Sequence, residues 1–297
     1  MARKVKLTPR ALGARESGVT VGVTPRQAGW KFVRFAVHQL APDVRWRVVS
    51  HREETCLVLL EGRCDVECDG SRNTLGPRAD VFSAYPHALY VPPGVRVTIT
   101  AASPATRIAE CAAPATRRFA PRLIRPEDCG FEIRGGGNAT RQIVDILPPA
   151  FPAHRLMICE VYTPGGNWSS YPPHKHDRDN PPREVDLDET YYYRFRGAPD
   201  AFGVQRLYGP KDEPDLTLTV RDGELVLVRD GYHPFVAAHG FDAYYLNVLA
   251  GSRRSMAASD DPRYAPFRAA WPLPDPRVPV VLPPYSPAAP PVPSWSV

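Results

Sequence analysis

The chain has 297 residues, which is enough for one large β domain or two domains of ordinary size. Its 37 lysines and arginines against 32 aspartates and glutamates give a formal charge of +5, too small and scattered to favour nucleic-acid binding but suited to a small anionic partner. No apolar run reaches the roughly 20 residues that a membrane helix needs. The basic start "MARKVKLTPRALGARESG" has no hydrophobic segment behind it. We therefore expect a cytoplasmic protein that binds neither nucleic acid nor membrane.

Short segments rich in β-branched and aromatic residues follow one another along the chain, with Gly, Pro and Asp between them. Helix-period patterns are almost absent. The segments are, in chain order, "CLVLLEG" (56–62), "CDVECDG" (64–70), "ALYVPPGVRVTITAA" (88–102), "RLMICEVYTPGG" (155–166), "TYYYRFRG" (190–197), "VQRLYG" (204–209), "LTLTVRDGELVLVRDG" (216–231) and "AYYLNVLAG" (243–251). Each fits one strand or a hairpin, so the chain is predicted to be all-β, as a sandwich or barrel.

A weak internal repeat divides this pattern in two. Glu54 and Thr55 precede the strand "CLVLLEG" much as Glu189 and Thr190 precede "YYYRFRG", at an offset of about 135 residues. Two tandem β domains related by duplication are therefore expected.

The predicted domains are residues 1–125 and 126–271, followed by a proline-rich tail at 272–297 that should be extended or disordered. The first copy has Val95-Arg96 where the second has Tyr232-His233, and no His-x-His precedes Glu54. The first domain is thus expected to be metal-free and structural, and the second to carry the chemistry.

A cluster of potential metal ligands marks the second domain. His174 and His176 are two residues apart, so in an extended segment both imidazoles point to the same side. Glu189 opens the following strand, and His233 follows a turn after another apolar strand. Three imidazoles and a carboxylate suit a divalent transition metal with positions left open. Zn, Mn, Fe and Ni all remain possible on this basis.

A structural role is the alternative for each of these side chains. An isolated histidine in a β protein is usually a surface residue or a hydrogen-bonded core residue. Here the pair is accompanied by an acid and a third histidine at matching places of the repeat, which favours ligation. His38, His51, His87, His154 and His239 lack such company.

These residues resemble the motifs of the cupins, small β-barrels that hold a metal with three histidines and a glutamate. The matching positions are Gly166, His174, His176, Glu189 and Gly197 in the first motif, and Gly223, Gly231, His233 and Asn247 in the second. The resemblance implies two tandem cupin barrels. The loop between His176 and Glu189 is longer than usual, and Arg229 replaces the usual proline.

A narrower resemblance covers about residues 20–251. The chain is similar to the 5-deoxy-glucuronate isomerase family of myo-inositol breakdown, itself similar to the 5-keto-4-deoxyuronate isomerases. The segments that carry it are "GWKFVRF", "FSAYPHALYVPPG", "IRPED", "RGGGNATRQIV", "EVYTPGGNWSSYPPHKHD", "ETYYYRF", "QRLYG" and "GYHPFVAAHGFDAYYLNVLAG". It implies conversion of the aldose 5-deoxy-D-glucuronate into the ketose 2-deoxy-5-keto-D-gluconate, and self-association into a homo-oligomer.

Further residues are candidates for handling this sugar acid. Tyr191, Tyr193 and Tyr245 are expected on the barrel interior as proton donors or shuttles, although strand aromatics are more often core. Gln205 and Arg206 are candidates for substrate binding, with Arg206 as a bidentate clamp for the carboxylate if its side chain faces inward. No residue is identified as the general base.

A related uronate isomerase of the 5-keto-4-deoxyuronate type is one alternative function. Two more distant alternatives use the same fold. One is an Fe(II)-dependent cupin dioxygenase, and the other is a sugar-binding cupin without turnover. The tyrosines, glutamine and arginine near the site favour a polyol substrate over the apolar pocket usual in dioxygenases.

Overall fold

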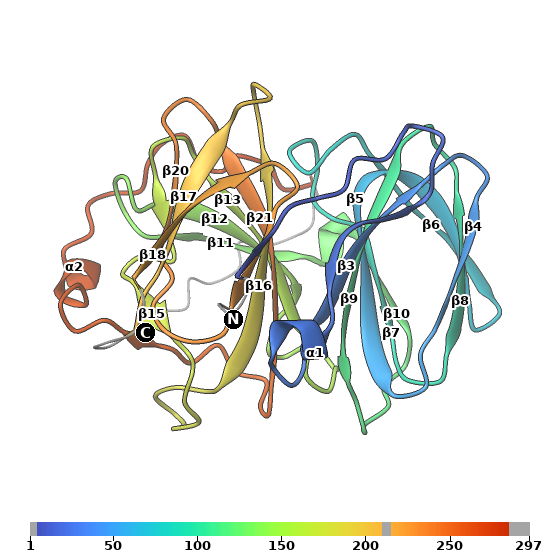
Figure 1. Cartoon of the computed structure of the whole chain (residues 1–297), viewed down its shortest axis with the longest axis horizontal. Coiled ribbons are helices and arrows are strands. Elements are labelled where there is room, and N and C mark those ends of the chain that lie inside the picture. Colours follow the sequence, from blue (N-terminus) through green and yellow to red (C-terminus); the bar gives the residue numbers. More distant parts are fainter. Residues whose placement is uncertain (1–4, 210–214, 285–297) are drawn as a thin grey trace.

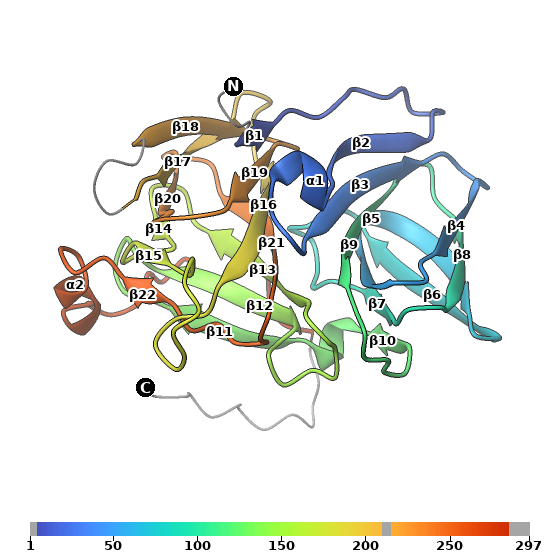
Figure 2. The same ribbon diagram turned by 60° about the horizontal axis from the view of Figure 1, so that its bottom comes forward.

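The computed structural model describes residues 5–209 and 215–284, and these form two β-barrels that lie side by side (Figures 1 and 2). The all-β prediction is confirmed, because the described helices are only short turns, namely α1 (Pro25–Ala28), η1 (Pro126–Asp128) and α2 (Pro266–Ala269). None of the described helices has the length and apolar character needed to cross a bilayer.

The first barrel is built on a nine-stranded antiparallel network with the long strand β5 at its centre. The first half of β5 pairs with β7 and β9, and the second half pairs with β6 and β8. The strands are β2 (Gly18–Val23), β3 (Arg34–Leu40), β4 (Arg45–Val49), β5 (Glu53–Cys68), β6 (Ser71–Arg78), β7 (Ala88–Val91), β8 (Arg96–Ala101), β9 (Thr106–Pro114) and β10 (Arg122–Ile124).

The second barrel combines a seven-stranded sheet with a four-stranded sheet and a two-stranded sheet. The large sheet contains, in spatial order, β1 (Lys6–Leu7), β19 (Leu225–Val228), β16 (Leu187–Phe195), β21 (Ala243–Gly251), β13 (Met157–Thr163), β12 (Arg141–Leu147) and β11 (Gly130–Arg134). The smaller sheets contain β14 (Trp168–Ser169), β20 (Phe235–Ala237), β17 (Phe202–Leu207) and β18 (Leu216–Arg221), and β15 (His174–Lys175) with β22 (Ser259–Asp260).

Segments near both ends of the described chain attach to the second barrel. Strand β1 pairs with β19, so the start of the chain adds an edge strand to the sheet that carries the site. In the proline-rich tail, Pro274 bridges to Gly137 and the backbone of Val281 bonds the buried Gln142 side chain. The tail up to residue 284 is therefore packed on the barrel, and its remainder, 285–297, lies outside the described residues.

Buried side chains form one core inside each barrel and a larger one between them. Strand β16 shows how the alternation of a strand serves two cores. Tyr192 packs in the core between the barrels, whereas Tyr191 and Tyr193 lie inside the second barrel. Strand β5 does the same, with Cys56 in the shared core and Leu57 inside the first barrel.

The two faces of these strands show that the match of Glu54 to Glu189 in the sequence repeat is displaced by one residue. Glu54 accepts hydrogen bonds from the backbone N–H groups of residues 154–156, at 2.5–2.8 Å, and Asp188 accepts them from residues 31–33, at 2.5–3.3 Å. Each acid thus ties its strand to a loop of the other barrel, which makes Asp188 the counterpart of Glu54. Because a shift of one residue exchanges the faces of a strand, Thr55 is then the counterpart of Glu189.

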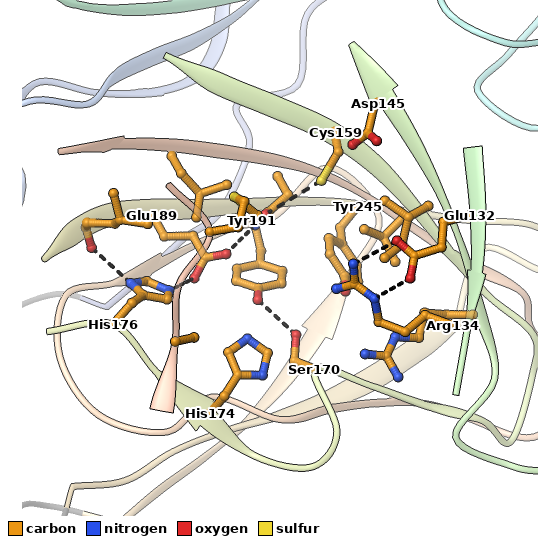
Figure 3. Close-up of a pocket in the computed structure, with 18 of the residues that line it drawn as sticks. Glu132, Arg134, Asp145, Cys159, Ser170, His174, His176, Glu189, Tyr191 and Tyr245 are labelled. Atoms are coloured by element: carbon orange, nitrogen blue, oxygen red, sulfur yellow. Dashed lines mark hydrogen bonds and ion pairs between the residues drawn. The ribbon is translucent and has the colours of Figure 1, made fainter. Parts of the chain in front are cut away.

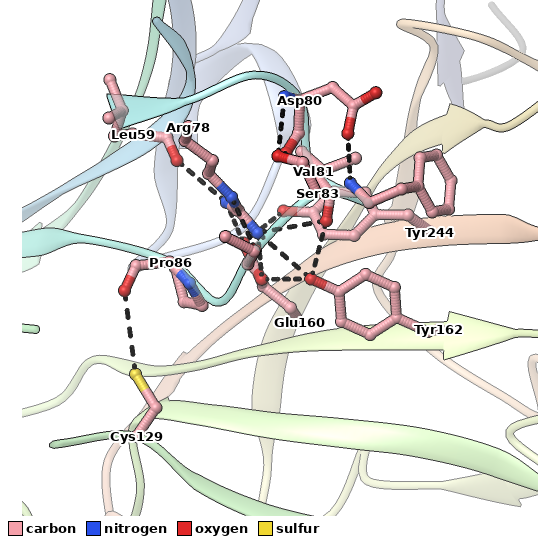
Figure 4. Close-up of polar contacts among 12 residues, drawn as sticks. Leu59, Arg78, Asp80, Val81, Ser83, Pro86, Cys129, Glu160, Tyr162 and Tyr244 are labelled. Atoms are coloured by element: carbon pink, nitrogen blue, oxygen red, sulfur yellow. Dashed lines mark hydrogen bonds and ion pairs between the residues drawn. The ribbon is translucent and has the colours of Figure 1, made fainter. Parts of the chain in front are cut away.

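A buried ion pair also joins the barrels. The Arg78 guanidinium in β6 donates two hydrogen bonds of 2.8 Å to Glu160 in β13, and both side chains are fully buried (Figure 4). The hydroxyls of Tyr162 and Tyr244 donate to the same carboxylate at 2.7 and 2.9 Å. Burial opposes the charge on Arg78, but Glu160 outweighs it and raises the pKa of the guanidinium. Two buried charges that are this well bonded hold the barrels in one register.

The Arg78→Met substitution should lower the free energy of unfolding by about 3–5 kcal/mol, because it leaves the Glu160 carboxylate buried without its cation. Urea unfolding followed by circular dichroism measures the effect. The matched control is Arg72→Met, whose side chain is 84% exposed and should change stability by less than about 0.5 kcal/mol. The double variant with Glu160→Met should regain much of the loss. Equal stability of the two single variants would contradict the role of the pair.

Candidate metal centre

The potential ligands come from three parts of the second barrel. His174 opens the short strand β15, and His176 follows directly after it. Glu189 projects into the barrel from β16, on the same face as Tyr191. His233 lies in the turn between β19 and β20. Between the two histidines Lys175 takes the opposite direction and bonds Asp177 and Glu184, at 2.5 and 2.7 Å, as expected for an alternating segment.

The three groups His176, Glu189 and His233 meet within the barrel, with their ligand atoms all within 4.8 Å of one another. Oε2 of Glu189 lies 2.8 Å from Nε2 of His176 and 3.2 Å from Nε2 of His233. The ring of His174 is next to them, with its centroid 4.8 Å from that of His233 (Figure 3 labels His174, His176 and Glu189). The structure thus clusters the ligand atoms of three of the four predicted ligands, and the ring of the fourth, His174, lies beside them.

The ligand set fits a metal ion. Nε2 of His233 is buried and, despite its distance of 3.2 Å from Glu189, has no hydrogen bond of good geometry to any described residue. Its other nitrogen, Nδ1, is 3.0 Å from the Gly231 carbonyl, and Nδ1 of His176 is 3.2 Å from the Leu187 carbonyl. When Nδ1–H donates to a carbonyl, Nε2 keeps its lone pair for a metal. An unsatisfied nitrogen aimed at a buried carboxylate is what a ligand without its ion presents.

Electrostatics favour the ligand forms of His174, His233 and Glu189. Burial lowers the pKa of His174 well below its ordinary value and also lowers that of His233, so both rings are neutral at pH 7. Burial would raise the pKa of Glu189, but His233 and His176 outweigh it and hold that pKa at about 2. At His176, by contrast, burial is outweighed by Glu189, which raises the pKa, so a metal ion would have to displace a proton from this ring. A permanently ionised carboxylate among imidazoles suits a divalent cation.

Neighbouring side chains fix the orientation of the ligands. Asn247 in β21 donates a 2.6 Å hydrogen bond to Oε1 of Glu189, which leaves Oε2 facing the histidines. Asp177 accepts from the N–H of Gly231 at 2.8 Å, and this joins the His-x-His segment to the turn that carries His233. Such outer contacts commonly decide metal affinity, because they remove the cost of ordering the ligands.

A cavity of about 460 Å³ opens beside this centre. Tyr191 and Tyr245 are on its wall, and their hydroxyls bond Ser170 at 2.9 Å and Ser169 at 3.1 Å. Burial raises the pKa of Tyr245 to about 12 and that of Tyr191 well above its ordinary value, so both phenols keep their protons at neutral pH. The predicted placement of these two tyrosines at the site therefore matches the structure.

The other three predicted site residues lie elsewhere. Tyr193 is fully buried, and its hydroxyl donates to the side-chain oxygen of Gln205. Gln205 is also fully buried and donates to the carbonyl of His233 at 2.5 Å, so both residues support the centre from behind. Arg206 points the opposite way, as its neighbour in a strand must, and pairs with Asp215 at 2.5 Å over the ring of Tyr208. The Arg206 side chain therefore does not face the cavity, so this geometry does not support the expected carboxylate clamp.

Sequence reasoning missed the opposite wall of the cavity, which β11 and β12 supply. Arg134, Arg141 and Asp145 line it. Burial raises the pKa of Asp145 to about 6, with a contribution from Glu132. The available signal was the alternation of charged residues with "I" and "V" in "FEIR" and "RQIVDIL", which places polar side chains on one face of each strand.

Comparison with known proteins gives a consistent result. The model of the KduI/IolB family matches residues 7–267. The chain is 43% identical over 249 residues to the 5-deoxy-glucuronate isomerase of Geobacillus kaustophilus, a match that covers 83% of this chain and 90% of that protein. It is 38% identical over 245 residues to that of Bacillus subtilis strain 168, covering 82% and 90% of the two chains.

Solved structures agree with these matches. An IolB-like protein from Salmonella typhimurium LT2 superposes with a TM-score of 0.85 at 34% identity, covering 90% of this chain and 99% of the other. Oxalate decarboxylase from Bacillus subtilis superposes with a TM-score of 0.62 at 11% identity, covering 88% and 79%, which is a likeness of fold alone. The predicted pair of tandem cupin barrels is thereby confirmed. From its matched length and its identity to these relatives, the chain belongs to the KduI/IolB family.

Proposed function

We propose that the protein is an aldose–ketose isomerase that converts 5-deoxy-D-glucuronate into 2-deoxy-5-keto-D-gluconate. The observation that carries this proposal is the cluster of His176, Glu189 and His233 at one end of a cavity whose other wall holds arginines. Relatives that are named for this activity share most of the chain. A cavity with ligands for a metal and cations for an acid suits a uronate with a reactive aldehyde end. On resemblance alone, we also propose that the protein is a homo-oligomer.

We propose that His174, His176, Glu189 and His233 hold a divalent transition metal, with Zn, Mn, Fe and Ni as candidates. Such an ion would act as a Lewis acid toward the sugar and would stabilise the negative charge that develops during the reaction. The carboxylate of Glu189 is committed to the histidines and to Asn247, so it is unsuited to abstract a proton.

The reaction removes the proton from C2, returns a proton to C1, and shifts one hydroxyl proton between the two oxygens. Tyr191 and Tyr245 are protonated at neutral pH and bonded to serine hydroxyls, so they suit proton donation to a sugar oxygen. Among the cavity carboxyls, Asp145 has a pKa of about 6, close to the range in which a general base works best. We propose Asp145 as the proton acceptor.

Metal content tests the proposed ligands. His233→Ala should reduce bound metal from about one ion per chain to less than about 0.2, because the remaining ligands leave the ion poorly held. Elemental analysis after dialysis measures the content, and circular dichroism checks the fold. The control is His239→Ala, an exposed histidine outside the cluster that should keep its full metal content. Full metal content in the His233 variant would remove this residue from the centre.

Anaerobic turnover in heavy water tests the reaction. The metal-loaded protein should convert 5-deoxy-D-glucuronate into the ketose, with deuterium entering at the carbon that was C1, as seen by NMR. Under air, no oxygen should be consumed. Oxygen uptake would instead identify a dioxygenase, and unchanged substrate that still raises the melting temperature would identify a sugar-binding protein.

The pH dependence tests Asp145. A base must be deprotonated to act, so kcat/KM should rise with pH and level off above about 6, the pKa of this carboxyl. Asp145→Asn should lower kcat by roughly 100-fold and abolish the acidic limb. The control is Glu132→Gln, a carboxylate on the same wall that is paired with Arg134; this variant should keep the limb but move it to lower pH, because Glu132 contributes to the raised pKa of Asp145. An unchanged limb in the Asp145 variant would exclude it as the base.

A further inference from the structure

Three arginines line the cavity, and they differ in how their charge is balanced. Arg134 pairs with Glu132 through two hydrogen bonds of 2.8 Å, and Arg268 pairs with Asp260 at 2.7 and 2.8 Å. Arg141 has no carboxylate within ion-pair distance among the described residues, although it is the most deeply buried of the three, with 4% of its surface exposed. A buried cation without an anion is costly, so its persistence at the wall of a cavity indicates an anionic ligand.

Arg141 is held in place without being neutralised. Its Nη1 donates to the carbonyls of Ala139 and Tyr171, both at 3.1 Å, which leaves the rest of the fork for another partner. Burial lowers its pKa to about 10, and the neighbouring Arg134, directly opposite on β11, contributes. At pH 7 the guanidinium therefore stays charged. Because these two hydrogen bonds fix Nη1, the planar guanidinium of Arg141 is oriented before any ligand binds.

The position of Arg141 relative to the metal ligands matters for the chemistry. The carbonyl that it bonds belongs to Tyr171, three residues before His174. Arg141 and His174 both line the same cavity. In Figure 3 the cavity runs from His176 and Glu189, past Tyr191 and Tyr245, to Glu132 and Arg134, the cross-strand neighbour of Arg141. A cation and a metal centre thus face one cavity from different walls.

We propose that Arg141 binds the carboxylate of the substrate and thereby determines both specificity and orientation. The inference rests on the proposed function, in which the substrate is a six-carbon acid that reacts at C1 and C2. Its carboxylate is at the other end of that chain, so an anchor at Arg141 directs C1 and C2 toward His176, Glu189 and His233. The same contact selects acids over neutral aldoses, because a hydroxymethyl group leaves the buried guanidinium without an anion.

Kinetics with an acid and its neutral analogue isolate this contact. Arg141→Gln should lower kcat/KM for 5-deoxy-D-glucuronate by roughly 30- to 300-fold, mainly through KM. It should leave kcat/KM for 5-deoxy-D-glucose within about 3-fold, so the preference for the acid falls by the same factor. Arg141→Lys keeps the positive charge but not the two-pronged guanidinium, so it should lower kcat/KM for the acid by roughly 10-fold. Arg268→Gln, whose arginine already has a carboxylate partner, is the control and should change the preference by less than about 3-fold.

Binding separates failure of this inference from failure of the proposed function. The probe is the acid reduced at C1 to an alcohol, which cannot isomerise, with its neutral polyol counterpart as reference. Calorimetry on the full-length protein should show that Arg141→Gln weakens binding of the reduced acid by the factor seen in kcat/KM. The affinity for the neutral polyol should stay the same. If the wild-type protein binds the acid in this Arg141-dependent way but turns over no uronate, the role of Arg141 in carboxylate binding is confirmed and the proposed isomerase activity is wrong.

The opposite results overturn the anchor. Turnover of 5-deoxy-D-glucuronate with equal loss for acid and neutral compounds in Arg141→Gln would show that the residue only supports the loop at Ala139 and Tyr171. No loss for the acid in either Arg141 variant, with the fold intact by circular dichroism, would place the carboxylate elsewhere in the cavity.

Discussion

Strand β16 is buried on both faces, and this double burial organises the molecule. Its alternate residues meet two different environments. On one face Asp188 and Tyr192 hold the first barrel, and on the other Glu189 and Tyr191 face the cavity. A shift of one residue in its pairing would put the Glu189 carboxylate, a candidate metal ligand, into the core between the barrels. The contacts with the first barrel therefore secure the register on which the site depends.

The interior of the first barrel differs from that of the second. Its interior is packed with aliphatic side chains such as Leu57, Leu59 and Ile99, and Thr55 stands where the second barrel has Glu189. Both barrels have an acidic residue on the strand face that points toward the other barrel, Glu54 in one and Asp188 in the other. Each carboxylate accepts backbone hydrogen bonds from a loop of the other barrel. We interpret the pair as a duplication in which the contacts between the copies persisted and the ligands diverged.

The cavity brings together ionisable side chains whose pKa values are shifted in opposite directions. Burial lowers the pKa of His174 and of His233, and it raises the pKa of Asp145, while Glu189 stays ionised because two imidazoles and an amide surround it. Shifts in opposite directions among close neighbours are typical of sites that transfer protons or bind ions. In the function proposed above, a metal ion would balance the carboxylate of Glu189, and the carboxylate of the substrate would balance Arg141.

The sequence by itself determined the all-β architecture and placed the His-x-His pair together with Glu189 and His233, because the period of two in a strand assigns side chains to a face from spacing alone. It could not decide between Gln205 and Arg206, which point opposite ways, nor reveal Arg141, since nothing local says that β11 and β12 close the cavity opposite the histidines. Which strands become neighbours depends on contacts between residues far apart in the chain. Only the tertiary structure decided, therefore, that a buried guanidinium without a carboxylate partner shares a cavity with the metal ligands.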